Sequence, residues 1–116
     1  MAIAGHGIDV VDIERFGASL ERTPGLRDRL FALNERELPI ESLAARFAAK
    51  EALIKALGGS EGIAWTDIEV SRGDGRPTFI VTGETAAHFG RLGLTFHLSL
   101  SHDAGVATAS VIAEER

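Results

Sequence analysis

Three charged side chains on one expected helix, residues 42–57, are the best candidates in this chain for chemistry on a charged group. The helix reads SLAARFAAKEALIKAL and places the carboxylate of Glu51 between the cations of Lys50 and Lys55. Glu51 and Lys55 are four residues apart, so they occupy neighbouring positions on one helix face. Such a set suits a metal ion and a phosphate group. It also suits an ordinary surface ion pair beside a lysine that reaches out of the core, and the helix alone favours this structural interpretation.

A second candidate carboxylate is Asp9, which ends an apolar stretch expected to form a strand over residues 3–9. Gly5 and Gly7 in that strand indicate a close approach by another backbone or by a ligand. A carboxylate at the end of a buried strand is either hydrogen-bonded to backbone N–H groups or holds a cation, and the residues leave both open. Asp12 is better suited to cap the helix that follows it.

The bulk composition is that of one globular domain, residues 1–116, with 45% hydrophobic and 25% charged residues. The sequence contains no cysteine, which excludes disulfides and thiolate chemistry. It shows neither a run long enough to span a bilayer nor a secretory signal pattern, so we expect no membrane partner and a cytoplasmic location. A net charge of −5 argues against nucleic-acid binding. An acidic protein partner would need a local basic patch, for which five arginines are candidates: Arg15, Arg22, Arg27, Arg29 and Arg46.

The order of the expected elements predicts an α+β domain, in which an antiparallel sheet is covered by one long helix and several short ones. The long helix has Ser42 as its N-cap and stops at Gly58–Gly59. It buries a stripe made of Leu43, Phe47, Ile54 and Leu57, with Lys50 in the middle. A polar connector (34–41) precedes it and a glycine-rich loop (58–66) follows it. Shorter helices are expected after Asp12, over 26–33 and over 84–92, and further strands over 67–71, 77–82, 95–101 and 106–113, with turns at 73–75 and 102–105.

Three segments in this order resemble the bacterial holo-acyl-carrier-protein synthases, the small class of 4′-phosphopantetheinyl transferases. They are GIDVVDIERF at 7–16, ARFAAKEALIKALG at 45–58 and SLSHDAGVATA at 99–109. The family's marks are a G-I-D near the N-terminus, an F-A-x-K-E-A-x-x-K helix and a late S-H loop. The resemblance covers nearly the whole chain, although the connector at 34–41 is shorter than is common in the family.

The resemblance implies an activity, a cofactor and partners. The expected reaction moves the phosphopantetheine arm of coenzyme A to a serine hydroxyl of an apo acyl carrier protein, which is acidic and helical, and releases adenosine 3′,5′-bisphosphate. A divalent cation, usually Mg²⁺, bridges the pyrophosphate. Members of the family are typically homotrimers with the active site between two protomers. The carrier proteins used, from fatty-acid or polyketide synthesis or both, are not fixed by the sequence.

The resemblance also implies roles for individual residues. Asp9 and Glu51 match the metal ligands, and such a pair agrees with the preference of Mg²⁺ for one or two carboxylates plus water and phosphate oxygens. Lys55 matches the lysine that contacts phosphate. His102 matches the histidine that binds the nucleotide's phosphate in a neighbouring protomer's site. Asp103 is a candidate for holding the water shell of the metal.

Three points stay open under the resemblance. Lys50 either assists the reaction or simply packs. The base that takes the serine proton is either Glu51, acting through a metal-bound water, or a metal-bound hydroxide. Arg15 and Arg46 match basic positions that face the carrier protein, where local positive charge would speed association with an acidic partner.

Two other function classes compete with the transferase. One is a catalytically silent module that binds an acidic helical partner through its arginines, and the presence of Asp9, Glu51 and Lys55 together argues against it. The other is a metal-dependent phosphohydrolase acting on nucleotides. The chain lacks the group of several carboxylates that two-metal hydrolases use.

Overall fold

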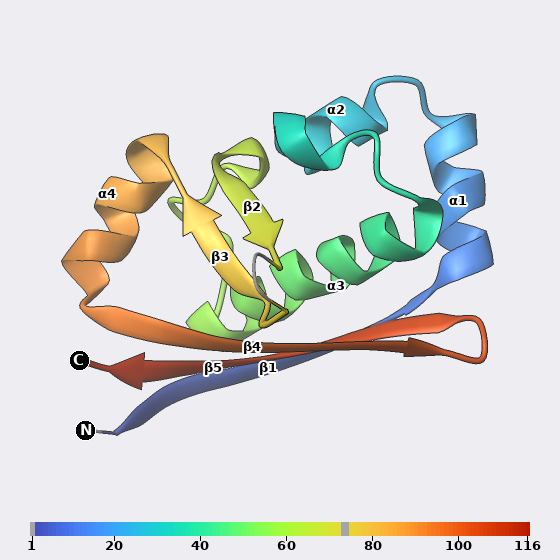
Figure 1. The fold of residues 1–116 in the computed structure, drawn as a ribbon. Coiled ribbons are helices and arrows are strands. Elements are labelled where there is room, and N and C mark those ends of the chain that lie inside the picture. The colour runs from blue at the N-terminus through green and yellow to red at the C-terminus, as the bar shows by residue number, and fades with distance from the viewer. Residues whose placement is uncertain (1, 73–74) are drawn as a thin grey trace.

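A three-stranded antiparallel sheet with one long helix laid across it forms the centre of the molecule (Figure 1). The computed structural model describes residues 2–72 and 75–116. The elements follow one another as β1 (Ile3–Asp12), α1 (Ile13–Arg22), α2 (Leu26–Leu30), η1 (Leu33–Glu35), α3 (Ile40–Leu57), η2 (Trp65–Asp67), β2 (Ile68–Ser71), β3 (Thr78–Val81), α4 (Gly83–Leu92), β4 (Leu94–Asp103) and β5 (Val106–Glu115). The predicted α+β fold with an antiparallel sheet is confirmed. Within these described ranges, no helix is long and apolar enough to cross a bilayer.

The large sheet carries helices on only one of its faces. Its strand order is β1–β5–β4, and both neighbouring pairs run antiparallel. On the central strand β5 every second side chain is buried, and these are Ala107, Ala109, Val111 and Ala113. Helices α1 to α4 lie on that side of the sheet, and no helix among residues 2–72 and 75–116 covers the other face, which is called the uncovered face below (Figure 1).

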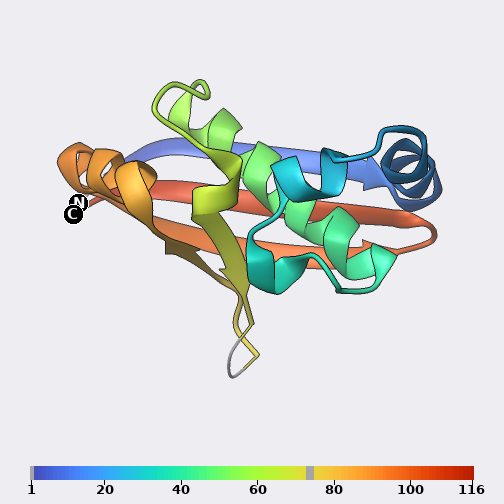
Figure 2. The same cartoon turned by 90° about the horizontal axis from the view of Figure 1, so that it is seen from above.

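The strands β2 and β3 form a second, two-stranded sheet that lies over α3 (Figures 1 and 2). They pair antiparallel, with Ser71 opposite Thr78. The predicted turn at 73–75 falls mainly on Gly73 and Asp74, which lie outside the described residues. The small sheet and the large one therefore cover α3 from two sides.

Alanine dominates the buried surface of α3. The predicted stripe is correct for Leu43, whereas Phe47, Ile54 and Leu57 are only partly buried. The small side chains let neighbouring elements pack close to the helix axis, so most sides of α3 are covered. Its buried alanines are Ala44, Ala45, Ala48, Ala49, Ala52 and Ala56.

The ends of the elements follow the predictions in part. Asp12 caps α1 as predicted, its carboxylate accepting a hydrogen bond from the backbone N–H of Arg15 at 2.8 Å. Gly58 ends α3 with a left-handed φ of 83°, also as predicted. The predicted N-cap at Ser42 is wrong because α3 begins earlier, at Ile40 after Pro39.

The glycines of β1 allow it to lie directly against the backbone of α3. A Cβ atom on Gly7 would collide with the carbonyl oxygen of Ala52, and one on Gly5 with that of Ala56. The close approach that the two glycines predicted is therefore made by another backbone. It sets the distance between β1 and the helix that carries Glu51.

Replacing Gly7 with alanine is expected to lower the free energy of unfolding by roughly 1–3 kcal/mol, because the added methyl group forces β1 away from α3. Urea denaturation followed by circular dichroism measures this. Gly90→Ala is the matched control, since Gly90 lies in α4 and an added Cβ there meets no atom within 4 Å. That control should be neutral or slightly stabilising. Equal stability of Gly7→Ala and the wild type would contradict the interpretation.

Candidate active site

Two carboxylates and one ammonium group meet where β1 crosses α3. Asp9 comes from β1, whereas Glu51 and Lys55 come from α3. The Lys55 ammonium donates hydrogen bonds to Asp9 Oδ1 at 3.1 Å and to the carbonyl of Ile8 at 3.0 Å. Solvent reaches this place, since the Lys55 side chain is 53% exposed and that of Asp9 is 16% exposed. The structure thus brings together Asp9 and Glu51, called the carboxylate pair below, and adds Lys55 to them.

The electrostatics of the carboxylate pair favour a cation. Burial raises the pKa of Glu51 above its ordinary value, and the negative charge of Asp9 raises it further. Lys55 acts on this pKa in the opposite direction, but as the smallest of the three effects. A divalent cation held by both carboxylates would remove their mutual repulsion.

The donor set at the carboxylate pair fits Mg²⁺. Among residues 2–72 and 75–116, no group of three or more histidine, aspartate or glutamate side chains lies close enough together to hold a metal. A metal ion here would therefore rest on two protein ligands. Mg²⁺ is commonly bound in this way, because it keeps several waters and takes further oxygens from a substrate's phosphates.

His102 and Asp103 lie away from the carboxylate pair within one chain. Both are exposed residues at the end of β4, where it turns into β5. Strand β5 separates them from β1, since Asp9 is paired with Ala109 and His102 with Ala107 on the other edge of β5. Their predicted roles at a nucleotide need the site of a second copy, and these roles stay predictions.

An apolar cavity of about 350 Å³ lies beside the carboxylate pair, bounded by β1, α1, α2 and α3. Phe47 lines it one helical turn before Glu51, so the cavity and the carboxylate pair are neighbours on α3. The exposed Arg15 of α1 lines the same cavity. Apart from Asp12 and Ser19, its remaining walls are apolar: Val10, Val11, Phe16, Leu26 and Leu30.

Arg46, in contrast to Arg15, points into the domain. It is 9% exposed, and its guanidinium donates to the carbonyl of Val70 at 3.2 Å and to that of Ser42 at 3.3 Å. It also lies 3.9 Å from a carboxylate oxygen of Glu35. These contacts join α3 to β2, and the predicted role of Arg46 in facing a carrier protein does not fit this placement.

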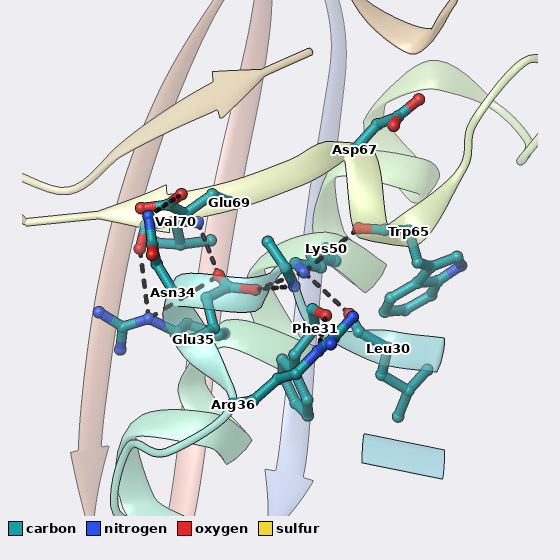
Figure 3. Close-up of polar contacts among 12 residues, drawn as sticks. Leu30, Phe31, Asn34, Glu35, Arg36, Lys50, Trp65, Asp67, Glu69 and Val70 are labelled. Carbon is teal, nitrogen blue, oxygen red and sulfur yellow. Dashed lines mark hydrogen bonds and ion pairs between the residues drawn. The ribbon is translucent and has the colours of Figure 1, made fainter. Parts of the chain in front are cut away.

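Lys50 is buried and does not reach out to solvent. Its ammonium donates to Glu35 Oε1 at 2.7 Å, and both side chains are 1% exposed (Figure 3). Burial lowers the pKa of Lys50, while the hydrogen bond to Glu35 acts against that shift. A buried pair of this kind is not strongly stabilising overall, but removal of one partner leaves an uncompensated charge in the core.

Glu35 is the residue that the sequence analysis missed. It lies in η1, inside the polar connector 34–41, where nothing in the local pattern indicates burial. The signal for a buried carboxylate is Lys50 on the expected helix 42–57, because a lysine in the middle of a buried stripe needs a buried anion as its partner. The connector offers three carboxylates for this purpose, Glu35, Glu37 and Glu41.

Comparison with known proteins shows the family to which the chain belongs. The family model described as the 4′-phosphopantetheinyl transferase superfamily matches residues 5–109. The chain belongs to this superfamily. The match includes the carboxylate pair, Lys55 and the β4–β5 turn with His102. The predicted family and the prediction that the chain is an enzyme are both confirmed.

Individual transferases of this superfamily resemble the chain over its whole length. A holo-[acyl-carrier-protein] synthase of Clavibacter michiganensis subsp. michiganensis is 61% identical over 114 residues, which cover 97% of this chain and 96% of the relative. The crystal structure of the synthase from Neisseria meningitidis has a TM-score of 0.90 at 26% identity and covers 98% of this chain and 100% of its own. The synthase from Bacillus anthracis str. Ames, in complex with CoA (3′,5′-ADP), has a TM-score of 0.80 at 33% identity and covers 98% of both chains.

Proposed function

We propose that this chain transfers 4′-phosphopantetheine from coenzyme A to a serine hydroxyl of an apo acyl carrier protein, with Mg²⁺ as cofactor and adenosine 3′,5′-bisphosphate as the second product. The observation that carries the proposal is the meeting of Asp9 and Glu51 beside Lys55 on the exposed side of the β1–α3 contact. The names of the relatives and the coenzyme A complex of the Bacillus anthracis synthase support it. The cytoplasmic location stays a prediction.

In the proposed reaction the serine oxygen forms a bond to the phosphorus that carries pantetheine. The bond from this phosphorus to the bridging oxygen of the pyrophosphate breaks, and the departing adenosine 3′,5′-bisphosphate keeps that oxygen with its electron pair. A base takes the serine proton. Mg²⁺, when bound, neutralises the pyrophosphate and stabilises the charge that develops on the leaving oxygen.

The residues of this chain have separate tasks in the proposed reaction. Asp9 and Glu51 would hold the cation. The Lys55 ammonium suits a phosphate oxygen as a compact point charge, and it reaches the site from solvent. Glu51 is also the base that we propose, acting through one water, because its carboxylate lies at the proposed cation, where the serine hydroxyl would meet the pyrophosphate.

The carrier protein docks, in our proposal, on the cavity beside the carboxylate pair. Arg15 offers positive charge at a cavity whose other walls are mainly apolar, which suits an acidic helix with an apolar side chain on its inner face. Three more exposed arginines lie on the neighbouring helices α1 and α2: Arg22, Arg27 and Arg29. Charge attraction would therefore be local, despite the net charge of −5.

We further propose a homotrimer in which His102 of one copy, followed by Asp103, completes the nucleotide site at the carboxylate pair of the next. The support is the uncovered face of the large sheet. Ile8 and Val10 alternate with the helix-facing residues of β1, and they are 59% and 61% exposed in the single chain. Apolar strand residues left in water on a face without helices indicate a protein contact.

Asp9→Asn and Glu51→Gln are each expected to lower the transfer rate by more than about 100-fold, because the charge stabilisation from a bound metal is worth several kcal/mol. Mass spectrometry of an apo carrier incubated with coenzyme A and Mg²⁺ follows the transfer, and EDTA should stop it for the wild type. Glu115→Gln, an exposed change on β5, is the control and should keep the wild-type rate. Near-normal transfer by either site variant at low Mg²⁺ would show that the ligand assignment is wrong. Release of free phosphopantetheine without a carrier would instead indicate a phosphohydrolase.

Arg15→Glu is expected to raise KM for the carrier about tenfold and to weaken its salt dependence, while kcat changes little, because the charge acts on encounter and docking. Initial rates measured against carrier concentration at two salt concentrations report both effects. Arg91→Glu makes the same charge change at an exposed position on α4, away from the cavity. An equal rise in KM for both variants would point to net charge instead of a docking site.

Ile8→Lys is expected to break the proposed trimer, since three copies would bring like charges together on a desolvated face, and Ile8 does not line the cavity. Light scattering should give the wild type three times the chain mass of 12.3 kDa and the variant a lower mass. Ile80→Lys is the control, because Ile80 is 46% exposed on β3 and lies outside the uncovered face. A wild-type mass of one chain would exclude the trimer.

A further inference from the structure

The buried ammonium of Lys50 is held by three segments that are far apart in the sequence. It donates to Glu35 Oε1 at 2.7 Å, to the carbonyl of Leu30 at 2.9 Å and to the carbonyl of Trp65 at 3.4 Å (Figure 3). These acceptors belong to η1, to the end of α2 and to η2. All three hydrogen-bonding positions of one ammonium group therefore serve to tie other segments to α3.

Glu35 extends the same set of contacts to the small sheet. Its Oε1 also accepts from the backbone N–H of Ala32 at 2.9 Å, and its Oε2 accepts from the backbone N–H of Val70 at 2.7 Å. No buried side-chain polar atom in the described part of the chain is left without a partner. The Glu35–Lys50 pair is thus a fully bonded junction between α2, η1, η2, β2 and α3.

Two of the segments tied by Lys50 lead to the cavity beside the carboxylate pair. The side chain of Leu30 forms one wall of that cavity. Trp65 stacks its ring on Phe47, with centroids 5.5 Å apart, and Phe47 forms another wall. Lys50 therefore fixes both walls through the backbone carbonyls of Leu30 and Trp65.

Lys50 is also the residue directly before Glu51. Its side chain is 1% exposed, so it cannot touch a substrate from this position. Successive helix residues are about 100° apart around the axis, so Lys50 points into the second layer while Glu51 takes a neighbouring direction on α3. The buried contact of Lys50 thus ties the cavity walls to the helix that carries Glu51.

We propose that the Glu35–Lys50 pair is a positioning element for the transfer, and this inference rests on the proposed function. The pair holds the Leu30 and Phe47 walls in one fixed relation to Glu51, so that a carrier docked in the cavity presents its serine to the carboxylate pair. A buried ion pair is often no more stabilising than apolar side chains of the same volume. Its value here is the geometry that it enforces.

The test is a double variant, Glu35→Gln with Lys50→Met. It removes both charges of the pair, so that neither member is left as a buried charge without the other. We expect kcat/KM for the carrier to fall by at least about tenfold, because a shift of about 1 Å in a positioned reactant can cost 100-fold. The loss should lie mainly in KM for the carrier. The affinity for coenzyme A with Mg²⁺, measured by calorimetry, should change by less than about twofold, since Asp9, Glu51 and Lys55 are untouched.

Arg46→Met is the matched control for the double variant. It removes a buried cation from the same region and leaves the Glu35–Lys50 hydrogen bond in place. Arg46 contacts Ser42, Val70 and, at 3.9 Å, the carboxylate of Glu35, but neither cavity wall. Its carrier KM should stay within about threefold of the wild type, because only displacement of a cavity wall should alter docking. The fluorescence of Trp65, the only tryptophan in the sequence, should shift in the double variant and much less in Arg46→Met. Equal losses in both variants would show that the pair acts only through general stability.

Leu30→Ala tests the inference if the double variant fails to fold. It shortens the cavity wall that Lys50 holds while leaving the ion pair intact, and it should raise carrier KM. Leu38→Ala is its control, since Leu38 packs on the core outside the cavity. An active wild type whose carrier KM is unchanged by both the double variant and Leu30→Ala would overturn the positioning role alone. A wild type that transfers nothing to any carrier would overturn the proposed function instead.

Discussion

The backbone contact between β1 and α3 is the constraint on which the rest of the structure depends. Gly5 and Gly7 leave no side chain between the strand and the carbonyls of Ala56 and Ala52, so the two elements lie as close as main chains allow. A closer or looser contact would change where Asp9 stands relative to the helix. The carboxylate pair is thus a consequence of how these two elements pack.

A second layer, built from α2, η1, η2 and the small sheet, is fixed to the opposite side of α3 by charge. Glu35, Lys50 and Arg46 are largely buried there, and their bonds run mainly to backbone groups of the neighbouring segments. If these short segments made only apolar contacts with the alanine-rich surface of α3, they could pack on it in several arrangements. Directional bonds from one lysine and one glutamate select a single arrangement.

Features that depend on residue types in short windows could be predicted from the sequence. The burial of side chains that contact distant segments could not. The fold class, the Asp12 cap and the stop at Gly58 follow from residue types in short windows, and the structure agrees with them. Glycines in β1 correctly indicated a close approach. The burial of Arg46 and of Glu35 could not be read locally, because each depends on a segment more than ten residues away. Lys50 was the one clue, since a charge in a buried stripe demands a partner.

The pairing of the first strand with the last has a consequence for how the enzyme is made. Among the described residues, strand β1 takes its only sheet partner from β5, so the contacts that frame Asp9 join distant parts of the sequence. Pairings between such distant segments form late, because a long stretch of chain must be ordered first. During synthesis on the ribosome, β5 emerges after every other element. The edge of β1 therefore stays without its partner until β5 has been made, and we expect the strand that carries Asp9 to take its final place late in folding.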